Sequence, residues 1–202
     1  MQGSANPSIS ASDLACRRGD RLLFRGLSFA LKAGEALHVT GANGTGKTTL
    51  IRALAGLLTP YSGSVESESA IGLLDERPAL DPDLPLAKAL GFWERIDGCR
   101  DPAGALSVLG LIPLLEVPVR YLSTGQRKRA AFAALLNRGV PIWLLDEPLS
   151  GLDSYAIAQI LSLIRLHQSG GGIAIISSHQ PLEIKDLRTL AIEDFALAVE
   201  ES

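Results

Sequence analysis

Cysteine is scarce in this 202-residue sequence, which contains only Cys16 and Cys99. The two cysteines lie far apart, without CxxC spacing or a nearby histidine cluster, so the sequence predicts neither a disulfide framework nor a zinc site. We interpret both as structural thiols. This pattern is typical of a protein that works in a reducing cytoplasm.

Long apolar runs and an excess of charge of one sign are also missing. Glycine, proline or charge interrupts every apolar run before the roughly 18 residues that a membrane-spanning helix needs, and residues 1–10 lack the features of a signal peptide. We therefore expect a soluble or peripheral protein. Lys and Arg number 19 against 22 Asp and Glu, a formal net charge of −3. Because this net charge does not attract polyanions, we expect no nucleic-acid partner. Any bound phosphate has to be held by the local arrangement of a few residues.

Strand-length apolar runs alternate with helical patterns along the chain, which predicts an α/β fold. Residues 36–40, 142–145 and 173–177 are continuously apolar, as parallel strands buried on both faces should be. Crossover helices are expected where apolar residues recur at helical spacing. These residues are Leu50, Ile51, Leu54 and Leu58 in one helix, and Ile157, Ile160, Leu161 and Ile164 in another that ends at glycines 170–172.

The stretch from about residue 78 to residue 139 has a different character. It is rich in leucine and alanine, contains several prolines and includes no convincing strand. We interpret it as a helical subdomain inserted into a single domain, residues 1–202, whose core comprises about 9–77 and 140–202.

Residues 41–49 read GANGTGKTT and match the phosphate-loop pattern G-x-x-x-x-G-K-[ST] between a predicted strand and a predicted helix. The glycines let the backbone turn tightly and direct its N–H groups at phosphates, beside the positive end of the helix. Lys47 supplies charge to the β and γ oxygens, and the Thr48 hydroxyl suits Mg²⁺. The predicted nucleotide-binding residues of the loop are Gly41, Ala42, Asn43, Gly44, Thr45, Gly46, Lys47, Thr48 and Thr49.

Two further strands end in polar side chains at the sheet edge where parallel sheets bind ligands. The run VPIWLLDEP ends in Asp146, a predicted Mg²⁺ ligand, and Glu147, a candidate base for the water that attacks the γ-phosphate. The run GIAIISSH ends in His179, whose imidazole could bond that phosphate or that water. Either pattern alone would be an ordinary surface feature, but the phosphate loop favours the catalytic interpretation.

Residues 122–126 read LSTGQ. Ser123 and Gln126 have capping-box spacing, so Ser123, the Gly125 N–H and the following helix, residues 126–136, should form a second anion site. The run resembles the LSGGQ signature of ABC-type ATPases, the ATP-binding subunits of ABC transporters. The resemblance extends over about residues 9–193 and implies a RecA-like phosphate-loop NTPase core with a helical signature subdomain.

The resemblance also implies how such subunits work. In that family the signature of one subunit closes on ATP in the phosphate loop of the other, which implies a head-to-tail homodimer with ATP and Mg²⁺ as ligands. It further implies ATP hydrolysis coupled to transport and an integral membrane permease as partner. SGLD at residues 150–153 resembles the D-loop of the family, which adds Asp153 to the predicted site.

Two positions depart from the family pattern. Glu76 stands where the family usually has a glutamine that contacts the metal, so a metal contact by Glu76 is an open question. Where many members stack an aromatic ring on adenine, this chain has arginines, and the guanidinium of Arg17 or Arg18 could stack instead. We select Arg18 as the candidate.

Within the family, several strings are similar to the ATPase subunit of the bacterial haem exporter of cytochrome c maturation. They are LACRRGDRLLFRGLSFAL, RALAGLLTPYSG, GFW and SSHQPLE. This likeness implies a peripheral protein on the cytoplasmic face of the cell inner membrane. The permease should dock between the two lobes, where Phe92 and Trp93 are either contacts or simply core residues.

Three alternatives stay open at this level. The chain could serve another small-molecule ABC exporter. It could be a non-transport ABC ATPase that acts on DNA or ribosomes, although such relatives carry long coiled coils or tandem domains that 202 residues do not provide. It could also be a regulatory module that binds nucleotide and barely hydrolyses it.

Overall fold

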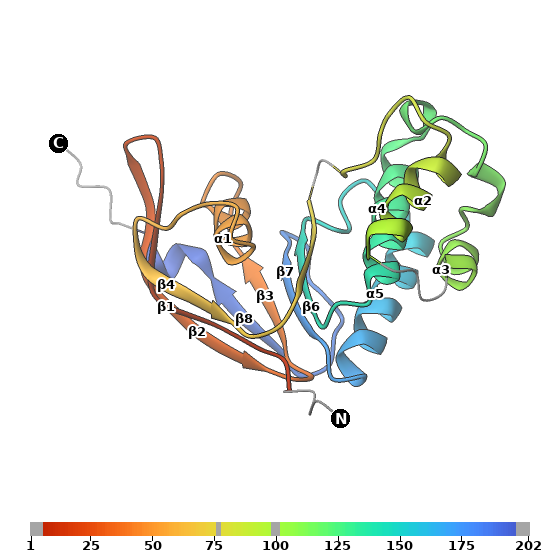
Figure 1. The fold of residues 1–202 in the computed structure, drawn as a ribbon. Helices are drawn as coiled ribbons and strands as arrows, with labels where there is room; N and C mark the ends of the chain where they lie inside the picture. Colours follow the sequence, from red (N-terminus) through yellow and green to blue (C-terminus); the bar gives the residue numbers. More distant parts are fainter. Residues whose placement is uncertain (1–5, 76–77, 98–101, 197–202) are drawn as a thin grey trace.

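The main sheet has five parallel strands drawn from both halves of the chain. The structure is a computed structural model that describes residues 6–75, 78–97 and 102–196. The three predicted strands lie at the centre of this sheet (Figure 1), so the predicted α/β class is confirmed. The strand order is β5 (Ile71–Leu74), β6 (Ile142–Asp146), β7 (Ile173–Ser177), β3 (Ala36–Thr40) and β8 (Leu187–Ala191).

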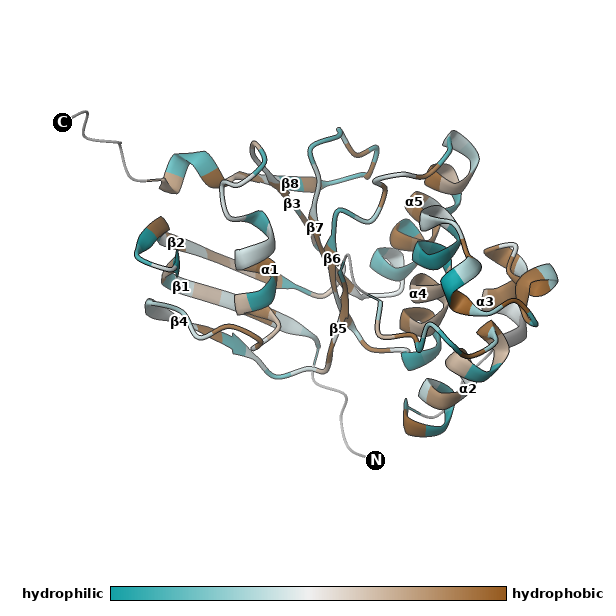
Figure 2. Ribbon diagram, turned by 90° about the horizontal axis from the view of Figure 1, so that it is seen from above, coloured by the Kyte–Doolittle hydropathy of each residue, from teal (hydrophilic) through white to brown (hydrophobic). Residues whose placement is uncertain are grey.

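Both faces of this sheet are covered, which explains why its central strands are continuously apolar. All five residues of β6 and all five of β7 are buried. Successive side chains of a strand point to opposite faces, so Ile142 and Leu144 pack on one side of the sheet while Trp143 and Leu145 pack on the other. Figure 2 shows these strands in brown between the two layers.

A second, antiparallel sheet and one helix form the layer on the first side. The sheet has the order β2 (Arg21–Lys32), β1 (Ser8–Arg18) and β4 (Ser62–Ser67). Helix α1 (Lys47–Leu54) lies between the two sheets, where it contacts β1, β6 and β7 (Figure 1).

Helix α1 ends earlier than the apolar periodicity predicted. Leu50, Ile51 and Leu54 are buried helical residues as expected, but Leu58 lies beyond the end of the helix. Gly56 adopts the left-handed conformation, with φ of +71°, and the Leu57 N–H donates to the Arg52 carbonyl. This arrangement is a glycine-terminated helix end, so the prediction for Leu58 was wrong.

Helices form the layer on the second side (Figures 1 and 2). The helix predicted before the three glycines is α5. The described residues between 78 and 139 form no strand of either sheet; their one β-bridge is an isolated pair, Pro85 and Pro118. No helix in the described ranges is long and apolar enough to span a bilayer. The helices are α2 (Leu86–Asp97), α3 (Pro102–Val108), α4 (Thr124–Arg138) and α5 (Ser154–Ser169), with 3-10 turns at Ile112–Leu114, Val119–Tyr121 and Ile192–Phe195.

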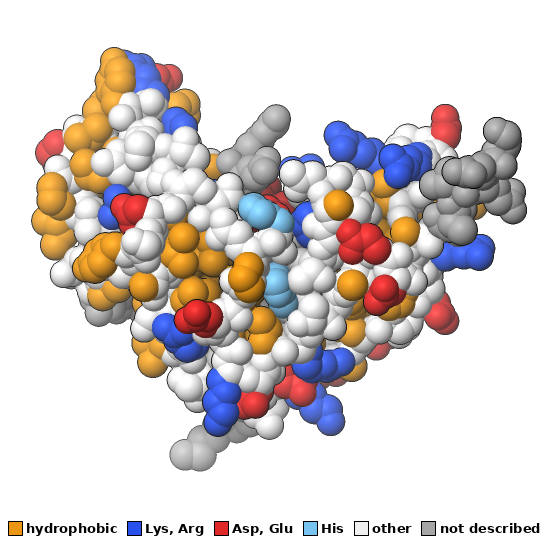
Figure 3. All heavy atoms as spheres, turned by 180° about the vertical axis from the view of Figure 1, so that it is seen from behind, with side chains coloured by type: hydrophobic (Ala, Val, Ile, Leu, Met, Phe, Trp, Pro, Cys, Tyr) orange, Lys and Arg blue, Asp and Glu red, His pale blue; other side chains and the backbone are white. Residues whose placement is uncertain are grey.

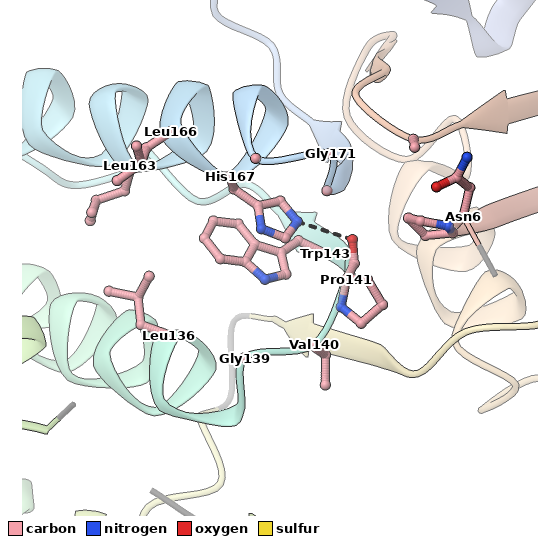
Figure 4. A pocket seen from close by; sticks show the side chains of 14 residues that line it. Asn6, Leu136, Gly139, Val140, Pro141, Trp143, Leu163, Leu166, His167 and Gly171 are labelled. Carbon is pink, nitrogen blue, oxygen red and sulfur yellow. Dashed lines mark hydrogen bonds between the residues drawn. The ribbon is translucent and has the colours of Figure 1, made fainter. Parts of the chain in front are cut away.

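A cavity of about 580 Å³ lies at the amino ends of β6 and β7, where the chain enters the sheet (Figure 4). The His167 ring stacks on Trp143 at 3.8 Å between centroids, and its Nε2 donates to the carbonyls of Pro141 and Ile173 at 3.1 and 3.3 Å. A Cβ on Gly172 would come within 2.3 Å of this ring. Burial lowers the pKa of His167. These contacts tie α5 to the end of the sheet remote from the phosphate loop.

Candidate nucleotide site

The phosphate loop connects β3 to α1, and its shape depends on glycine. Gly41 and Gly46 have φ of +147° and +116°, a region that other residues rarely adopt. A Cβ on Gly41 would lie 2.7 Å from Ile192 Cγ2, and one on Gly46 would lie 3.2 Å from the Phe24 ring. The loop therefore packs closely on the elements behind it and turns its open side to solvent.

Lys47 is held at the mouth of this loop. Its side chain is 6% exposed, and Nζ donates to the carbonyls of Gly41 and Ala42 at 2.7 and 3.1 Å. The same Nζ lies 3.8 Å from Glu147 Oε1. A cation restrained this way can exchange carbonyl partners for phosphate oxygens with little rearrangement.

A cavity of about 230 Å³ opens at the loop. Gly41, Ala42 and Thr45 do not line it. The Thr45 hydroxyl donates to the Ala42 carbonyl, and the Ala42 N–H donates to Glu193 Oε1. Of the predicted loop and site residues, the cavity brings together Arg18, Asn43, Gly44, Gly46, Lys47, Thr48, Thr49 and Glu147, with Leu23.

Arg18 lines this cavity, whereas Arg17 has another partner. The Arg17 guanidinium lies 5.4 Å from the centroid of the Tyr61 ring, a cation–π contact. Of the two arginines considered for adenine stacking, the structure therefore leaves Arg18 at the nucleotide cavity.

The two carboxylates at the end of β6 have different environments. Asp146 is 1% exposed, and its Oδ1 accepts a hydrogen bond from the Ser177 hydroxyl. Glu147 has φ of +46°, and its N–H donates to the carbonyl and the hydroxyl of Ser177 at 3.0 and 3.1 Å. This left-handed turn directs the Glu147 carboxylate toward Lys47 and the loop.

His179 completes this cluster. Its Nδ1 lies 3.0 Å from Glu147 Oε2, and because an ionised carboxylate only accepts, the contact requires the proton on Nδ1. The side chain is 54% exposed. Histidine side chains, in pale blue, reach the surface near the middle of the face in Figure 3, where acidic and basic side chains are interspersed.

The chemistry of the donor set fits a magnesium ion. Among the residues described, no cluster of three or more His, Cys, Asp or Glu could hold a metal by itself. Thr48 at the loop and Asp146 at the strand end offer only oxygen. Mg²⁺ prefers such ligands, usually taking one or two carboxylates together with phosphate oxygens and water. Glu76 lies outside the described residues, so its contact with a metal stays a prediction.

The signature residues form the predicted capping box. The Gln126 N–H donates to Ser123 Oγ at 3.2 Å, and the Ser123 N–H donates to Gln126 Oε1 at 2.8 Å. Helix α4 begins at Thr124, two residues before the predicted start. Ser123, Gly125 and Gln126 do not line the phosphate-loop cavity of the same chain. Asp153 does not line it either; its carboxylate caps α5 by accepting from the Ala156 N–H at 2.8 Å.

Sequence reasoning missed three residues that support the site. Ser177 forms hydrogen bonds with Asp146, the last residue of β6, and with Glu147, the residue after it, and its position at the end of β7 could have indicated this. The Glu193 carboxylate accepts from the Ala42 N–H, but 151 residues separate the pair and no pattern connects them. Lys128 reaches the backbone beyond β6 from α4, although its sequence neighbours suggest an exposed helical lysine.

Comparison with known proteins shows the family to which the chain belongs. The family model described as ABC transporter matches residues 24–150. The cytochrome c biogenesis ATP-binding export protein CcmA of Novosphingobium aromaticivorans is 57% identical over 187 residues, 93% of this chain and 96% of that protein. The protein of the same name from Zymomonas mobilis is 48% identical over 191 residues, 94% of this chain and 86% of that protein.

Solved structures share the fold. An ATP-binding subunit of an ABC transporter has a TM-score of 0.77 and 22% identity, over 85% of this chain and 79% of that one. A bacterial Atm1-family ABC exporter with ATP bound has a TM-score of 0.78 and 23% identity, over 93% of this chain and 37% of that one. The chain belongs to the ABC transporter family, in the group of cytochrome c biogenesis ATP-binding export proteins, and it couples ATP hydrolysis to transport.

Proposed function

We propose that this chain hydrolyses MgATP at the Lys47 loop to power the haem exporter of cytochrome c biogenesis. The observation that carries the catalytic part is the position of the Glu147 carboxylate, 3.8 Å from Lys47 Nζ on one oxygen and 3.0 Å from His179 Nδ1 on the other. A carboxylate held between a phosphate-binding cation and an imidazole is suited to orient and deprotonate a water.

In the proposed reaction, the water oxygen forms a bond to the γ-phosphorus and the bond from that phosphorus to the ADP oxygen breaks. The water proton moves to Glu147, and the electron pair leaves with ADP. Lys47 neutralises charge on the transferred phosphoryl group, and His179 orients the water or the γ-phosphate. Thr48 and Asp146 would hold the Mg²⁺, which supplies charge neutralisation at the β and γ oxygens when it is bound.

We further propose that two copies of the chain enclose the nucleotide. Ser123, Gly125 and Gln126 present a capped helix N-terminus, a favourable anion site, but they lie outside the cavity of their own chain. A second copy arranged head to tail would bring this site to the γ-phosphate in the Lys47 loop. Asp153, on the connection between β6 and α5, would lie at the same interface.

The proposed partner is an integral membrane permease that docks between a core of about residues 9–77 and 140–202 and a helical subdomain of about 78–139. A groove of about 280 Å³ lined by Leu57, Asp75, Trp93 and Arg138, among others, supports this surface. Trp93 is half-buried, with its Nε1 bonded to the Ala79 carbonyl, while the neighbouring Phe92 is 48% exposed. Docking there would keep the chain on the cytoplasmic face of the inner membrane.

The proposal that ATP hydrolysis powers haem export rests on the curated relatives, which are named cytochrome c biogenesis ATP-binding export protein. The test is complementation of a strain that lacks this gene. The parent chain should restore covalent haem on periplasmic c-type cytochromes, and Lys47→Ala should not. Normal cytochrome c levels in the deletion strain, or in cells with only Lys47→Ala, would rule out this function.

A further inference from the structure

Lys128 is a buried cation that the reaction described above does not use. It lies on α4 and is 8% exposed. Its Nζ donates to the backbone carbonyls of Glu147 and Ser150 at 2.5 and 2.7 Å. An ammonium group is costly to bury, so a buried lysine needs such partners. The two carbonyls belong to the catalytic carboxylate residue and to the connection that leads to α5.

The backbone of Glu147 needs support from both sides. A left-handed φ of +46° is an unfavourable conformation for a residue other than glycine and persists where the surroundings fix it. Ser177 holds the Glu147 N–H through its carbonyl and its hydroxyl. Lys128 holds the Glu147 carbonyl. Both contacts hold the backbone conformation that directs the Glu147 side chain toward Lys47.

The same helix carries the proposed contact with the second nucleotide. Helix α4 starts at the Ser123 capping box, and Lys128 follows five residues later, about one and a half turns along the helix. We treat the 15 residues of helix α4 as one rigid body. A displacement of its N-terminus by a bound phosphate would therefore reach the Glu147 carbonyl through Lys128.

We propose that Lys128 is a positioning residue that couples the signature helix to the orientation of the Glu147 carboxylate. The inference rests on the proposed function of Glu147 and Ser123. Lys128 does not line the phosphate-loop cavity, and in this arrangement it acts on the reaction through the backbone of residues 147–150. Its effect should therefore appear in the rate of hydrolysis rather than in the binding of ATP.

The experiment compares Lys128→Met, which keeps an unbranched side chain one atom shorter and removes the charge and the donors, with Lys128→Arg, which keeps both. Lys88→Met, at an exposed lysine of α2, is the matched control. We expect Lys128→Met to lower kcat on the order of 10- to 100-fold, the loss typical of a charge-assisted hydrogen bond. KM for ATP should stay within about twofold, Lys128→Arg should recover most of the rate, and Lys88→Met should match the parent.

Two results would overturn this inference. One is a parental kcat in Lys128→Met. The other is a parallel loss of kcat, ATP affinity and Tm that Lys128→Arg does not recover, which indicates a purely structural lysine. If Lys128→Met does not fold, Lys128→Gln, which removes the charge but retains a neutral N–H donor, is compared with Lys128→Arg instead, and parental kcat in Lys128→Gln would show that the charge of Lys128 is not needed. Glu147→Gln separates the two proposals, because parental turnover in that variant contradicts the proposed base whatever Lys128 does.

Discussion

Substitution of Ser123 separates two roles that the structure gives to one hydroxyl. As an N-cap, Ser123 Oγ accepts from the Gln126 N–H at 3.2 Å, and loss of such a cap costs about 1 kcal/mol. In a domain of this size, that cost corresponds to a Tm lower by about 2–4 °C. As a phosphate ligand in the dimer, the hydroxyl donates to a charged group. Such a bond contributes about 1.5–3 kcal/mol, or about 10- to 150-fold in kcat/KM.

Two substitutions distinguish these roles. Ser123→Ala removes both the cap and the donor, whereas Ser123→Asn keeps a good capping acceptor and removes the hydroxyl. We expect Ser123→Ala to lose both Tm and kcat/KM, and Ser123→Asn to lose kcat/KM with a Tm close to that of the parent. Calorimetry and steady-state ATPase assays measure the two quantities. Parental kcat/KM in Ser123→Asn would refute the role of the hydroxyl as a phosphate ligand.

Three further predictions concern the loop, the groove and pH. Lys47→Ala should lose nucleotide affinity in equilibrium binding, and normal binding would contradict the loop assignment. Trp93→Ala should lower recovery of the membrane complex more than ATP binding, whereas equal losses would indicate a core residue. Burial lowers the pKa of His38 and of His167 from the ordinary 6.5, so these two rings gain protons in the unfolded chain before they do in the folded one as the pH falls below about 6.5. Tm should therefore fall below that pH, less steeply in His167→Gln, and a pH-independent Tm would contradict the assignment of neutral buried rings.

The central strands and the phosphate loop were predictable because local signals determine them. The apolar runs of β6 and β7 are continuous since both of their faces are covered. Each run ends in polar residues at one edge of the sheet, which predicted that Glu147 and His179 serve the same site; their contact at 3.0 Å is a finding of the structure. The Ser123 capping box is local as well and was confirmed as a structural feature.

Contacts between distant segments were not predictable. The selection of Arg18 over Arg17 had no support in the sequence itself, because the difference between them depends on Tyr61 of a later segment, which pairs with Arg17. It did not predict that Lys128 would turn inward, since that depends on two backbone carbonyls beyond β6. The end of α1 was misjudged because the apolar spacing continues through a glycine with positive φ.

The most direct test of the account is the mass of the Glu147→Gln variant in solution with MgATP. If ATP is enclosed between two copies and cannot be hydrolysed, light scattering after gel filtration should give twice the 21.4 kDa of the chain. Addition of Ser123→Asn to this variant should return it to the monomer. A Glu147→Gln chain that binds ATP fully and stays a monomer would contradict the shared nucleotide site.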